Sequence, residues 1–372
     1  MLFVNDYPSS LEEWWIGRAC RHYSVSKLED CAGNLQNAIR RLSDFFKENH
    51  NSRFPDYQRD PELALAYGLF YFPQSFMRIQ FPLTEILASG WTPPIDRPIR
   101  ILDLGCGVGA AGFGAVSLLQ SDQMRTRTSA THNAGPKAGA PYIEGWALDH
   151  SEDALQIHKE LSASFGMWNH LHGNLHDQRT SGIPKMDLIL LSFTLTEIAS
   201  DFERSLDSWL RRLHPKGALL VLEPFSKPGK RRLEKYRDRL IVEKNYRVLA
   251  PSASLISHKM RTWDLPESMI LLNRDLNRIV DELNFTFLAI APEVPTAEAA
   301  EFLLITPFVR SKGKWIASGR TSDGHDHQYE ILSRHVTPEM KRKLEKLKRG
   351  DSVHVSNVQV AGTSLRFEVL ED

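Results

Sequence analysis

Three glycines at alternate positions constrain this chain more than any other feature. Gly105, Gly107 and Gly109 follow the apolar run Ile99–Leu104 in the stretch RILDLGCGVGAAGFGA. The apolar run predicts a buried strand, and the small residues from about Val108 to Gln120 predict a helix. Glycines between the two allow a tight turn whose backbone a ligand can approach closely. The amide groups that open the helix then face that ligand.

Two carboxylates accompany this turn. Asp103 precedes it directly, and Asp149 ends the next apolar run, EGWALD. A carboxylate at the end of the second strand accepts ribose hydroxyls in nucleotide-binding folds. The spacing from Gly105 to Asp149 exceeds the usual ~20 residues. The polar segment over residues 121–140 accounts for the excess, and we interpret it as a long insertion.

The turn is compatible with a dinucleotide or with S-adenosylmethionine, and a tight turn without any ligand is the third possibility. A pyrophosphate needs only the helix N-terminus, whereas the sulfonium donor has no phosphate and favours an acid such as Asp103. The form Leu-Asp-Leu-Gly-Cys-Gly-x-Gly resembles the first motif of class I methyltransferases more than the GxGxxG of dehydrogenases. In such enzymes the residue at Asn174 contacts adenine; Asp177 and an ordinary polar loop are the alternatives. We therefore predict an S-adenosylmethionine site formed by Asp103, Gly105, Cys106, Gly107, Gly109, Asp149, His150, Asn174, Leu175 and Ser192.

Apolar runs alternate with helical patterns from Ile99 to Glu223, which argues for a parallel sheet with crossover helices. Ahead of them, residues 9–50 and 61–87 are predicted to be helical, the second stretch being interrupted at Pro73 and Pro82. The expected fold is α/β, a Rossmann-like seven-stranded class I methyltransferase sheet. An N-terminal helical region precedes it, and a small C-terminal β-rich appendage follows.

The end of the chain has a different character. The apolar runs FTFLAI and EFLLITPFV are expected to pair as a hairpin at the edge of the sheet. From Gly313 onward we expect a hairpin turning at Ser322-Asp323-Gly324, a short basic helix and two more strands, which could form a small nucleic-acid-binding barrel. The predicted domains are a helical region over residues 1–95, a methyltransferase domain over 96–310 and a β-rich domain over 311–372.

Composition narrows the classes of function. The 372 residues have a formal net charge of zero, so no overall field favours nucleic acid or membrane. No apolar run approaches the roughly 20 residues of a membrane helix, and the N-terminal stretch lacks the basic region of a signal peptide. Three cysteines without CxxC spacing indicate a reducing compartment and no cysteine-ligated metal. We expect a cytoplasmic location.

The fourth apolar run excludes some chemistry. MDLILLSFTLTEI lacks the Asn/Asp-Pro-Pro-aromatic motif that cradles an exocyclic amine, and it carries no cysteine for a covalent route. Methyl transfer from a sulfonium is an in-line displacement that rests on positioning and desolvation. A general base is needed only where the acceptor loses a proton. Glu197 is the candidate for that base, and a helix-start carboxylate is its alternative role.

Three further stretches resemble one family of methyltransferases. SFTLTEI, ALLVLEPFSKPGKRRLEKYRDRL and RVLAPSAS are similar to the mitochondrial small-ribosomal-subunit assembly methyltransferase family and its bacterial relatives. The resemblance covers roughly residues 60–315 and implies association with the small ribosomal subunit or its rRNA. The family's cysteine cluster, thought to hold an iron–sulfur centre, has no counterpart here, because Ser252 follows Ala250-Pro251 and no cysteine lies beyond residue 106. Since thiolates hold such clusters, we expect neither a cluster nor another metal.

Two basic stretches bear on the partner. Residues 227–239 contain seven Lys/Arg against two acids, and residues 341–349 contain six against one. Either stretch is compatible with a solvated helix face or with an RNA backbone. We predict RNA contacts by Lys230, Arg231, Arg232, Lys341, Arg342 and Lys343. Three functions remain open: methylation of rRNA or a small-subunit component, methylation of a small molecule or protein with the aromatics around Tyr67, Phe70 and Phe72 as a lid, and donor binding by an assembly factor that transfers nothing.

Overall fold

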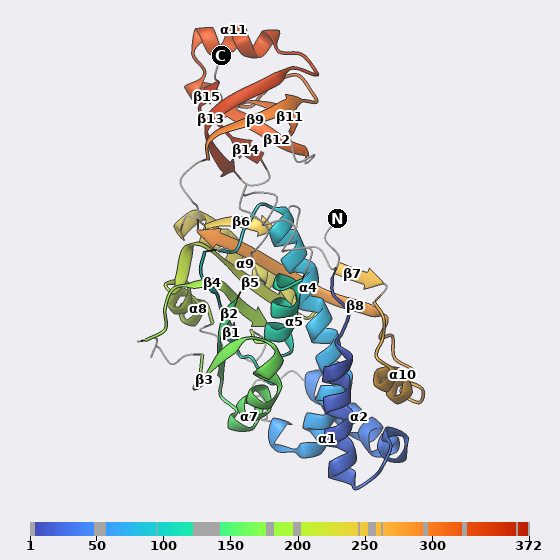
Figure 1. Ribbon diagram of the computed structural model, residues 1–372. Helices are drawn as coiled ribbons and strands as arrows, with labels where there is room; N and C mark the ends of the chain where they lie inside the picture. Colours follow the sequence, from blue (N-terminus) through green and yellow to red (C-terminus); the bar gives the residue numbers. More distant parts are fainter. Residues whose placement is uncertain are drawn as a thin grey trace. The chain divides into compact units, whose positions relative to one another are not determined.

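A computed structural model of the chain is shown in Figure 1. It describes residues 4–47, 57–94, 96–121, 142–175, 182–195, 202–244, 246–251, 258–261, 263–292, 297–321, 326–361 and 364–370. The chain divides into two compact units. One unit comprises residues 1–244 and 249–292, and the other comprises residues 245–248 and 293–372.

Helices open the first unit. They are α1 (Ser9–Tyr23), α2 (Ala32–Lys47), α3 (Pro61–Ala66), one π-helical turn (Tyr67–Tyr71) and α4 (Phe72–Ala88). The predicted interruption at Pro82 is wrong, because α4 continues through this residue. A proline removes one backbone donor, and the burial of Ile79, Leu83 and Ile86 around it keeps the helix on the core. Pro73 lies in the first turn of α4, where a proline is tolerated because no donor is needed.

The larger sheet has the order β3-β2-β1-β4-β5-β8-β6, with β7 paired to β8, and all of it except residues 246–248 of β6 belongs to the first unit. Its strands are β1 (Ile99–Leu104), β2 (Ile143–Asp149), β3 (Met167–His172), β4 (Met186–Ser192), β5 (Leu213–Glu223), β6 (Tyr246–Ala250), β7 (His258–Arg261) and β8 (Glu282–Pro292). Strands β1 to β5 are mutually parallel, and β8 is antiparallel to β5. This arrangement confirms the predicted Rossmann-like sheet of the class I methyltransferase fold.

Helices follow the strands as crossovers (Figure 1). They are α5 (Ala110–Leu119), α7 (Glu152–Leu161), α8 (Phe202–Leu210) and α9 (Lys227–Lys244), whereas α10 (Glu267–Asn273) connects the adjacent antiparallel strands β7 and β8. Buried side chains of α4, α5 and α7 join one apolar core with those of β1. From β1 the chain runs outward through β2 to β3, and it then returns to β4 on the other side of β1. The strand order therefore reverses between the neighbouring strands β1 and β4. In doubly wound sheets such a reversal opens a crevice at the carboxyl ends of the strands, where ligands bind.

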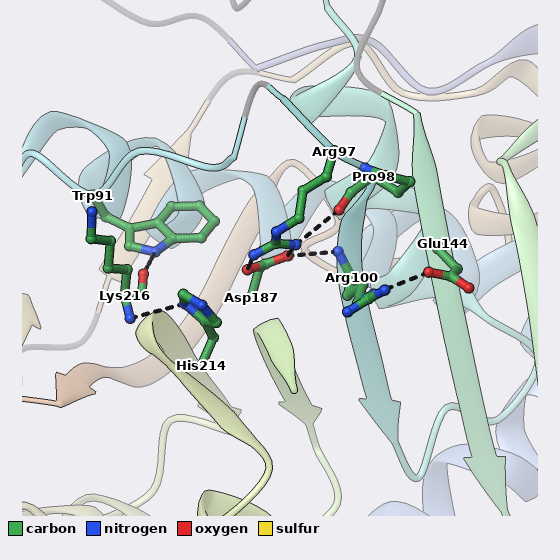
Figure 2. A network of polar contacts seen from close by, with 8 residues as sticks. All are labelled: Trp91, Arg97, Pro98, Arg100, Glu144, Asp187, His214 and Lys216. Atoms are coloured by element: carbon green, nitrogen blue, oxygen red, sulfur yellow. Dashed lines mark hydrogen bonds and ion pairs between the residues drawn. The ribbon is translucent and has the colours of Figure 1, made fainter. Parts of the chain in front are cut away.

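A polar network closes the opposite edge of the sheet, at the amino ends of its strands (Figure 2). Arg97 holds the buried Asp187 with two hydrogen bonds of 2.7 and 2.6 Å, and the backbone N–H of Arg100 donates to the same carboxylate. The Trp91 indole donates to the carbonyl of Lys216 at 3.0 Å. These contacts tie the linker after α4 to β1, β4 and β5, and they leave the carboxyl edge free for a site.

The second unit is a β-structure with a core of its own. It contains β9 (Ala297–Leu304), β10 (Val309–Ser311), β11 (Lys314–Arg320), β12 (Asp326–Leu332), α11 (Pro338–Lys346), β13 (Ser352–Ala361), β14 (Ser364–Arg366) and β15 (Val369–Leu370). Strand β9 pairs with both β11 and β13, so β9, β11, β12, β14 and β13 form a closed ring. The predicted β-rich appendage is confirmed.

One expected pairing is wrong. FTFLAI lies in β8 and pairs with β5, whereas EFLL belongs to β9 and pairs in the second sheet. The domain boundary predicted between residues 310 and 311 therefore separates β9 and most of β10 from the strands with which they pair. An apolar run indicates a buried strand but does not indicate which strands pair with it. The predicted insertion beyond Ser121 and the turn at Ser322-Asp323-Gly324 lie outside the described residues, although β11 and β12 pair as the predicted hairpin.

Candidate functional site

The glycine turn has the tight geometry that its sequence predicts. Gly105, Gly107 and Gly109 all have positive φ, at 68°, 52° and 97°. A Cβ at Gly105 would lie 2.4 Å from the Thr194 side chain, whereas a Cβ at Gly107 would meet only the Gln58 amide at 3.9 Å. The turn is therefore packed from below at Gly105 and open above Gly107. The open side is where a ligand can touch the backbone.

Asp149 fixes this turn from the neighbouring strand. Its Oδ2 accepts the N–H of Gly107 at 2.8 Å, and its Oδ1 accepts the N–H of Ser151 at 2.9 Å. His150 lies beside it, with Nδ1 at 3.3 Å from Oδ1. A carboxylate oxygen accepts more than one hydrogen bond, so Asp149 retains lone pairs for hydroxyl donors. Both residues are among those predicted from the sequence.

Asp103 lies buried beneath the turn. Its Oδ2 accepts the N–H of Gly112 at 3.0 Å, and its Oδ1 has no hydrogen-bond partner among the described residues. Burial raises the pKa of Asp103 to about 7, the Gly112 bond opposes the rise, and the charge of Asp149 adds to it. A buried acid with an unsatisfied oxygen costs free energy. A cationic ligand at this turn would lower that cost.

Cys106 lies inside the turn and is almost fully buried. Burial, followed by the charges of Asp149 and Asp103, raises the pKa of its thiol well above the ordinary value. The thiolate is the nucleophilic form of cysteine, so Cys106 is not a nucleophile here. Its small side chain fills the turn, as the sequence analysis expected.

The end of β3 carries the residues predicted to contact adenine. Asn174 is exposed, and the carbonyl of Leu175 accepts the Trp209 indole N–H at 3.0 Å. The N–H of Gly173 donates to the carbonyl of Asp149 at 3.0 Å, so this segment is joined to the end of β2. The alternative adenine contact, Asp177, lies outside the described residues.

The end of β4 is anchored to both neighbouring strands. The Thr194 hydroxyl donates to the carbonyl of Leu104, and the N–H of Phe193 donates to the carbonyl of Leu222 at 2.8 Å. Phe193 has a φ of 60°, which is uncommon outside glycine and is found at functional turns. Ser192 is half-buried at this edge. Glu197, the predicted base, lies two residues beyond the last described residue of this segment.

Glu223 at the end of β5 was not predicted as a site residue. It is buried, and its Oε1 accepts the N–H of Leu195 at 2.9 Å. Burial raises its pKa to about 8, against the Leu195 bond and the charge of Arg232. The Arg232 guanidinium donates to the carbonyl of Leu195 at 2.7 Å. Glu223 and Arg232 thus hold the segment that leads to Glu197, and the signal for Glu223 was an acid ending an apolar strand, as at Asp103 and Asp149.

The aromatic side chains of the π-helical turn and of α4 belong to the hydrophobic core and do not line a pocket. Phe70 and Phe72 are 2% and 0% exposed. A Cβ at Gly68 would lie 2.2 Å from the Trp15 ring, so this helix packs directly on α1. A cavity of about 230 Å³ does lie near the turn, and Gln58, Arg18 and Asp153 are among its mostly polar lining. The described residues around Tyr67 therefore form no aromatic acceptor pocket.

The predicted RNA contacts divide into two groups. On α9, Arg231 is exposed, Lys230 is half-buried and pairs with Glu234, and Arg232 is partly buried in its bond to Leu195. On α11, Lys341 pairs with Glu345 and Lys343 with Glu339, while Arg342 is exposed. The two groups belong to different units of the chain.

A family model matches the central third of the chain. Residues 140–260 match Rsm22, described as mitochondrial small ribosomal subunit Rsm22. The Rsm22 match runs from the start of β2 to β7 and so includes Asp149, Glu223 and Arg232. It confirms the resemblance predicted from SFTLTEI and ALLVLEPFSKPG. A comparison with curated proteins finds no match.

Solved structures with a similar fold include several methyltransferases. An rRNA methylase from Streptococcus thermophilus is 9% identical, covers 56% of this chain and 94% of its own, and has a TM-score of 0.33. Magnesium protoporphyrin IX methyltransferase from Synechocystis, solved with its donor bound, is 12% identical, covers 67% and 90%, and has a TM-score of 0.35.

Two further findings concern metal ions and membranes. In the part of the chain that the structure describes, no three His, Cys, Asp or Glu side chains gather as a metal would require. Within the same residues, no helix has the length and apolar character to cross a bilayer.

Proposed function

We propose that this protein is an S-adenosylmethionine-dependent methyltransferase that acts on rRNA or another component of a small ribosomal subunit. The observation that carries the proposal is the turn at Gly107. Its backbone is open on one side and fixed by Asp149 on the other, and beneath it lies an Asp103 oxygen that has no hydrogen-bond partner among the described residues. This combination suits a ligand with ribose hydroxyls and a positive charge.

The residues of the turn fit the methyl donor better than a dinucleotide. Asp149 offers carboxylate lone pairs to the ribose, and Asp103 offers a negative charge to the cationic end of the donor. A pyrophosphate would instead bring two negative charges toward two carboxylates, which repel it. When bound, the donor supplies an activated methyl group, so the chain needs to bind, orient and exclude water.

Glu197 is the residue that we propose as base for an acceptor that must lose a proton. The segment leading to it is held by the Glu223–Leu195 and Arg232–Leu195 bonds. We assign Glu223 and Arg232 as positioning residues, since they act through Leu195. Asn174, Leu175 and Ser192 remain proposed cofactor contacts at the same edge of the sheet.

Two observations support an acceptor in the ribosome over a small molecule. Rsm22 is named for a small ribosomal subunit, and its match covers the second half of the site. The aromatics that would form a small-molecule lid are instead packed in the helical core. The cytoplasmic location predicted from the sequence stays a prediction, because the family description names a mitochondrial subunit.

The test is methyl incorporation into purified small ribosomal subunits from a labelled donor, with RNA and protein fractions separated afterwards. We expect label in the RNA fraction with the wild-type protein and much less with Asp149→Ala at a donor concentration below saturation. Donor binding without any transfer would refute the enzymatic proposal and leave a donor-binding assembly factor. Label found only in protein would refute the RNA acceptor.

A further inference from the structure

The ring of strands in the second unit has a specific topology. If β9 with β10 is taken as the first strand, then β11, β12, β13 and β14 are the second to fifth, and the closed order is 1-2-3-5-4-1. The third and fifth strands are parallel, and the other pairs are antiparallel. A helix, α11, lies between the third and fourth strands. This is the topology of the OB-fold, whose second and third strands and adjoining loops bind oligonucleotides in many proteins.

The barrel uses its aromatic side chains internally. Phe302 and Tyr329 stack at 3.5 Å, and both are buried. Leu344 of α11 packs into the same core. Bases bind OB-folds by stacking on exposed aromatics, and these rings are not exposed. Any nucleic acid bound here would have to be held mainly through its phosphates.

One surface offers the charge for such binding. The turn between the first and second strands contains Lys312 and Gly313, whose φ is 74°. The carbonyl of Gly313 accepts the N–H of Ser333 at 2.8 Å, and this bond brings the end of β12 beside the turn. Arg310, Lys312 and Arg334 are all exposed there. We call Arg310, Lys312, Lys314 and Arg334 the Gly313 patch.

The charge of the Gly313 patch is only partly neutralised. Lys314 and Arg366 share the single buried carboxylate of Glu330 and, against the effect of burial, hold its pKa below the ordinary value. Glu368 lies 3.6 Å from His335, the residue after Arg334. Among the described residues, Arg310 and Lys312 form no ion pair. At the far end of β11, by contrast, Arg320 is neutralised by Asp326.

We propose that the Gly313 patch binds the phosphate backbone of single-stranded RNA. The choice of RNA rests on the proposed function, whereas the anion site itself rests on the barrel. The patch lies on the loop and strands that OB-folds use for ligands, and the carboxylates of the described residues neutralise only part of its positive charge. The basic face of α11 fits less well, because Lys341 and Lys343 are paired with glutamates of the same helix.

The experiment measures binding of the full chain to a fluorescent single-stranded RNA by anisotropy, at several salt concentrations. The test variant is Arg310→Gln/Lys312→Gln/Arg334→Gln, which leaves the Lys314–Glu330 pair intact. We expect weaker binding, and a salt slope shallower by about 2, because each lost contact with a single strand contributes about 0.7. A variant with Arg310→Lys, Lys312→Arg and Arg334→Lys keeps the charge and should retain wild-type binding.

The matched control removes three exposed cations from the other unit, Lys27→Gln/Arg40→Gln/Lys216→Gln, and should bind like the wild type. Equal curves for the test variant and this control would overturn the proposal. So would wild-type binding to anionic phospholipid vesicles without binding to RNA, since the patch would then serve a membrane. Calorimetry with S-adenosylhomocysteine on the same variants reads the donor site alone. Failure of the wild-type protein to bind S-adenosylhomocysteine would count against the proposed function and not against the Gly313 patch.

Discussion

The backbone N–H of Gly107 donates to Oδ2 of Asp149 at 2.8 Å, across the ends of β1 and β2. The same carboxylate receives the N–H of Ser151 through its other oxygen at 2.9 Å. One side chain therefore shapes the turn after β1 and the start of α7 together. Ligand binding at this turn and the local fold depend on the same residue. Experiments on Asp149 must therefore measure both ligand affinity and stability.

Replacement of Asp149 by alanine should weaken binding of S-adenosylmethionine or S-adenosylhomocysteine by about 1–3 kcal/mol, the cost of leaving polar partners unpaired. Titration calorimetry measures the affinity, and thermal unfolding measures the accompanying loss of stability. Glu144→Gln, at the opposite end of the same strand, is the matched control and should bind normally. Tight NAD binding with no response to the methyl donor would contradict the assignment of the turn.

Gly107→Arg should abolish donor binding, because its side chain occupies the open space above the turn. Gly107→Ala is the milder comparison. Its Cβ has only an ordinary contact with Gln58, and the left-handed φ of 52° costs about 1–2 kcal/mol. Gly182→Arg tests the effect of an arginine at another left-handed glycine with open surroundings. Normal donor binding by Gly107→Arg would show that the ligand lies elsewhere.

Asp103 should make the stability of the ligand-free protein depend on pH. Its pKa rises from 3.8 to about 7 on folding, so the folded state favours the protonated acid. Its contribution is fully present below pH 3.8 and is lost as the pH rises toward 7. The loss is on the order of 4 kcal/mol, at about 1.4 kcal/mol per pKa unit.

Chemical unfolding of the wild type and Asp103→Asn at several pH values isolates this contribution as the difference between the two proteins. Asparagine can still accept the N–H of Gly112 but cannot ionise. A difference that stays constant between pH 4 and 8 would refute the assigned pKa. Donor affinity should also rise with pH up to about 7 in the wild type, since a cationic ligand prefers the ionised carboxylate.

The two basic stretches found in the sequence can be tested without Arg232. The fivefold variant Lys230→Gln, Arg231→Gln, Lys341→Gln, Arg342→Gln and Lys343→Gln should reduce the salt dependence of rRNA binding and leave donor binding intact. Filter binding of small-subunit rRNA measures the first effect. Adding Arg232→Gln should impair donor-site function through Leu195. Identical salt curves for wild type and the fivefold variant would exclude these stretches as RNA contacts.

The sequence was most informative where backbone geometry leaves few choices. Alternate glycines after an apolar run, with Asp103 before them and Asp149 at the next strand end, allow few local structures, and the structure has the predicted one. Thr194 could not be foreseen as the residue that packs under Gly105, because that contact joins strands far apart in the sequence. Glu223 escaped notice for a related reason, since its raised pKa arises from tertiary burial.

The wrong pairing of EFLL shows another limit. Both FTFLAI and EFLL are apolar enough for a strand, but β8 is buried along most of its length. In β9 the exposed Glu301 and Leu303 alternate with the buried Phe302 and Leu304. That alternation is typical of a strand with one face in solvent. It distinguishes the two strands, yet the identity of a partner is set by the loops and packing of the whole unit.

Closure of the ring in the second unit also bears on the solubility of the protein. Each strand of the ring has neighbours on both sides, so its backbone amides and carbonyls are not offered to another chain. The short β14 completes this protection, since it pairs with β12 on one side and with β13 on the other. A chain truncated before Ser364 would leave β12 and β13 with free edges. Such edges recruit strands from other molecules, so loss of the last nine residues should cause aggregation before it affects any site.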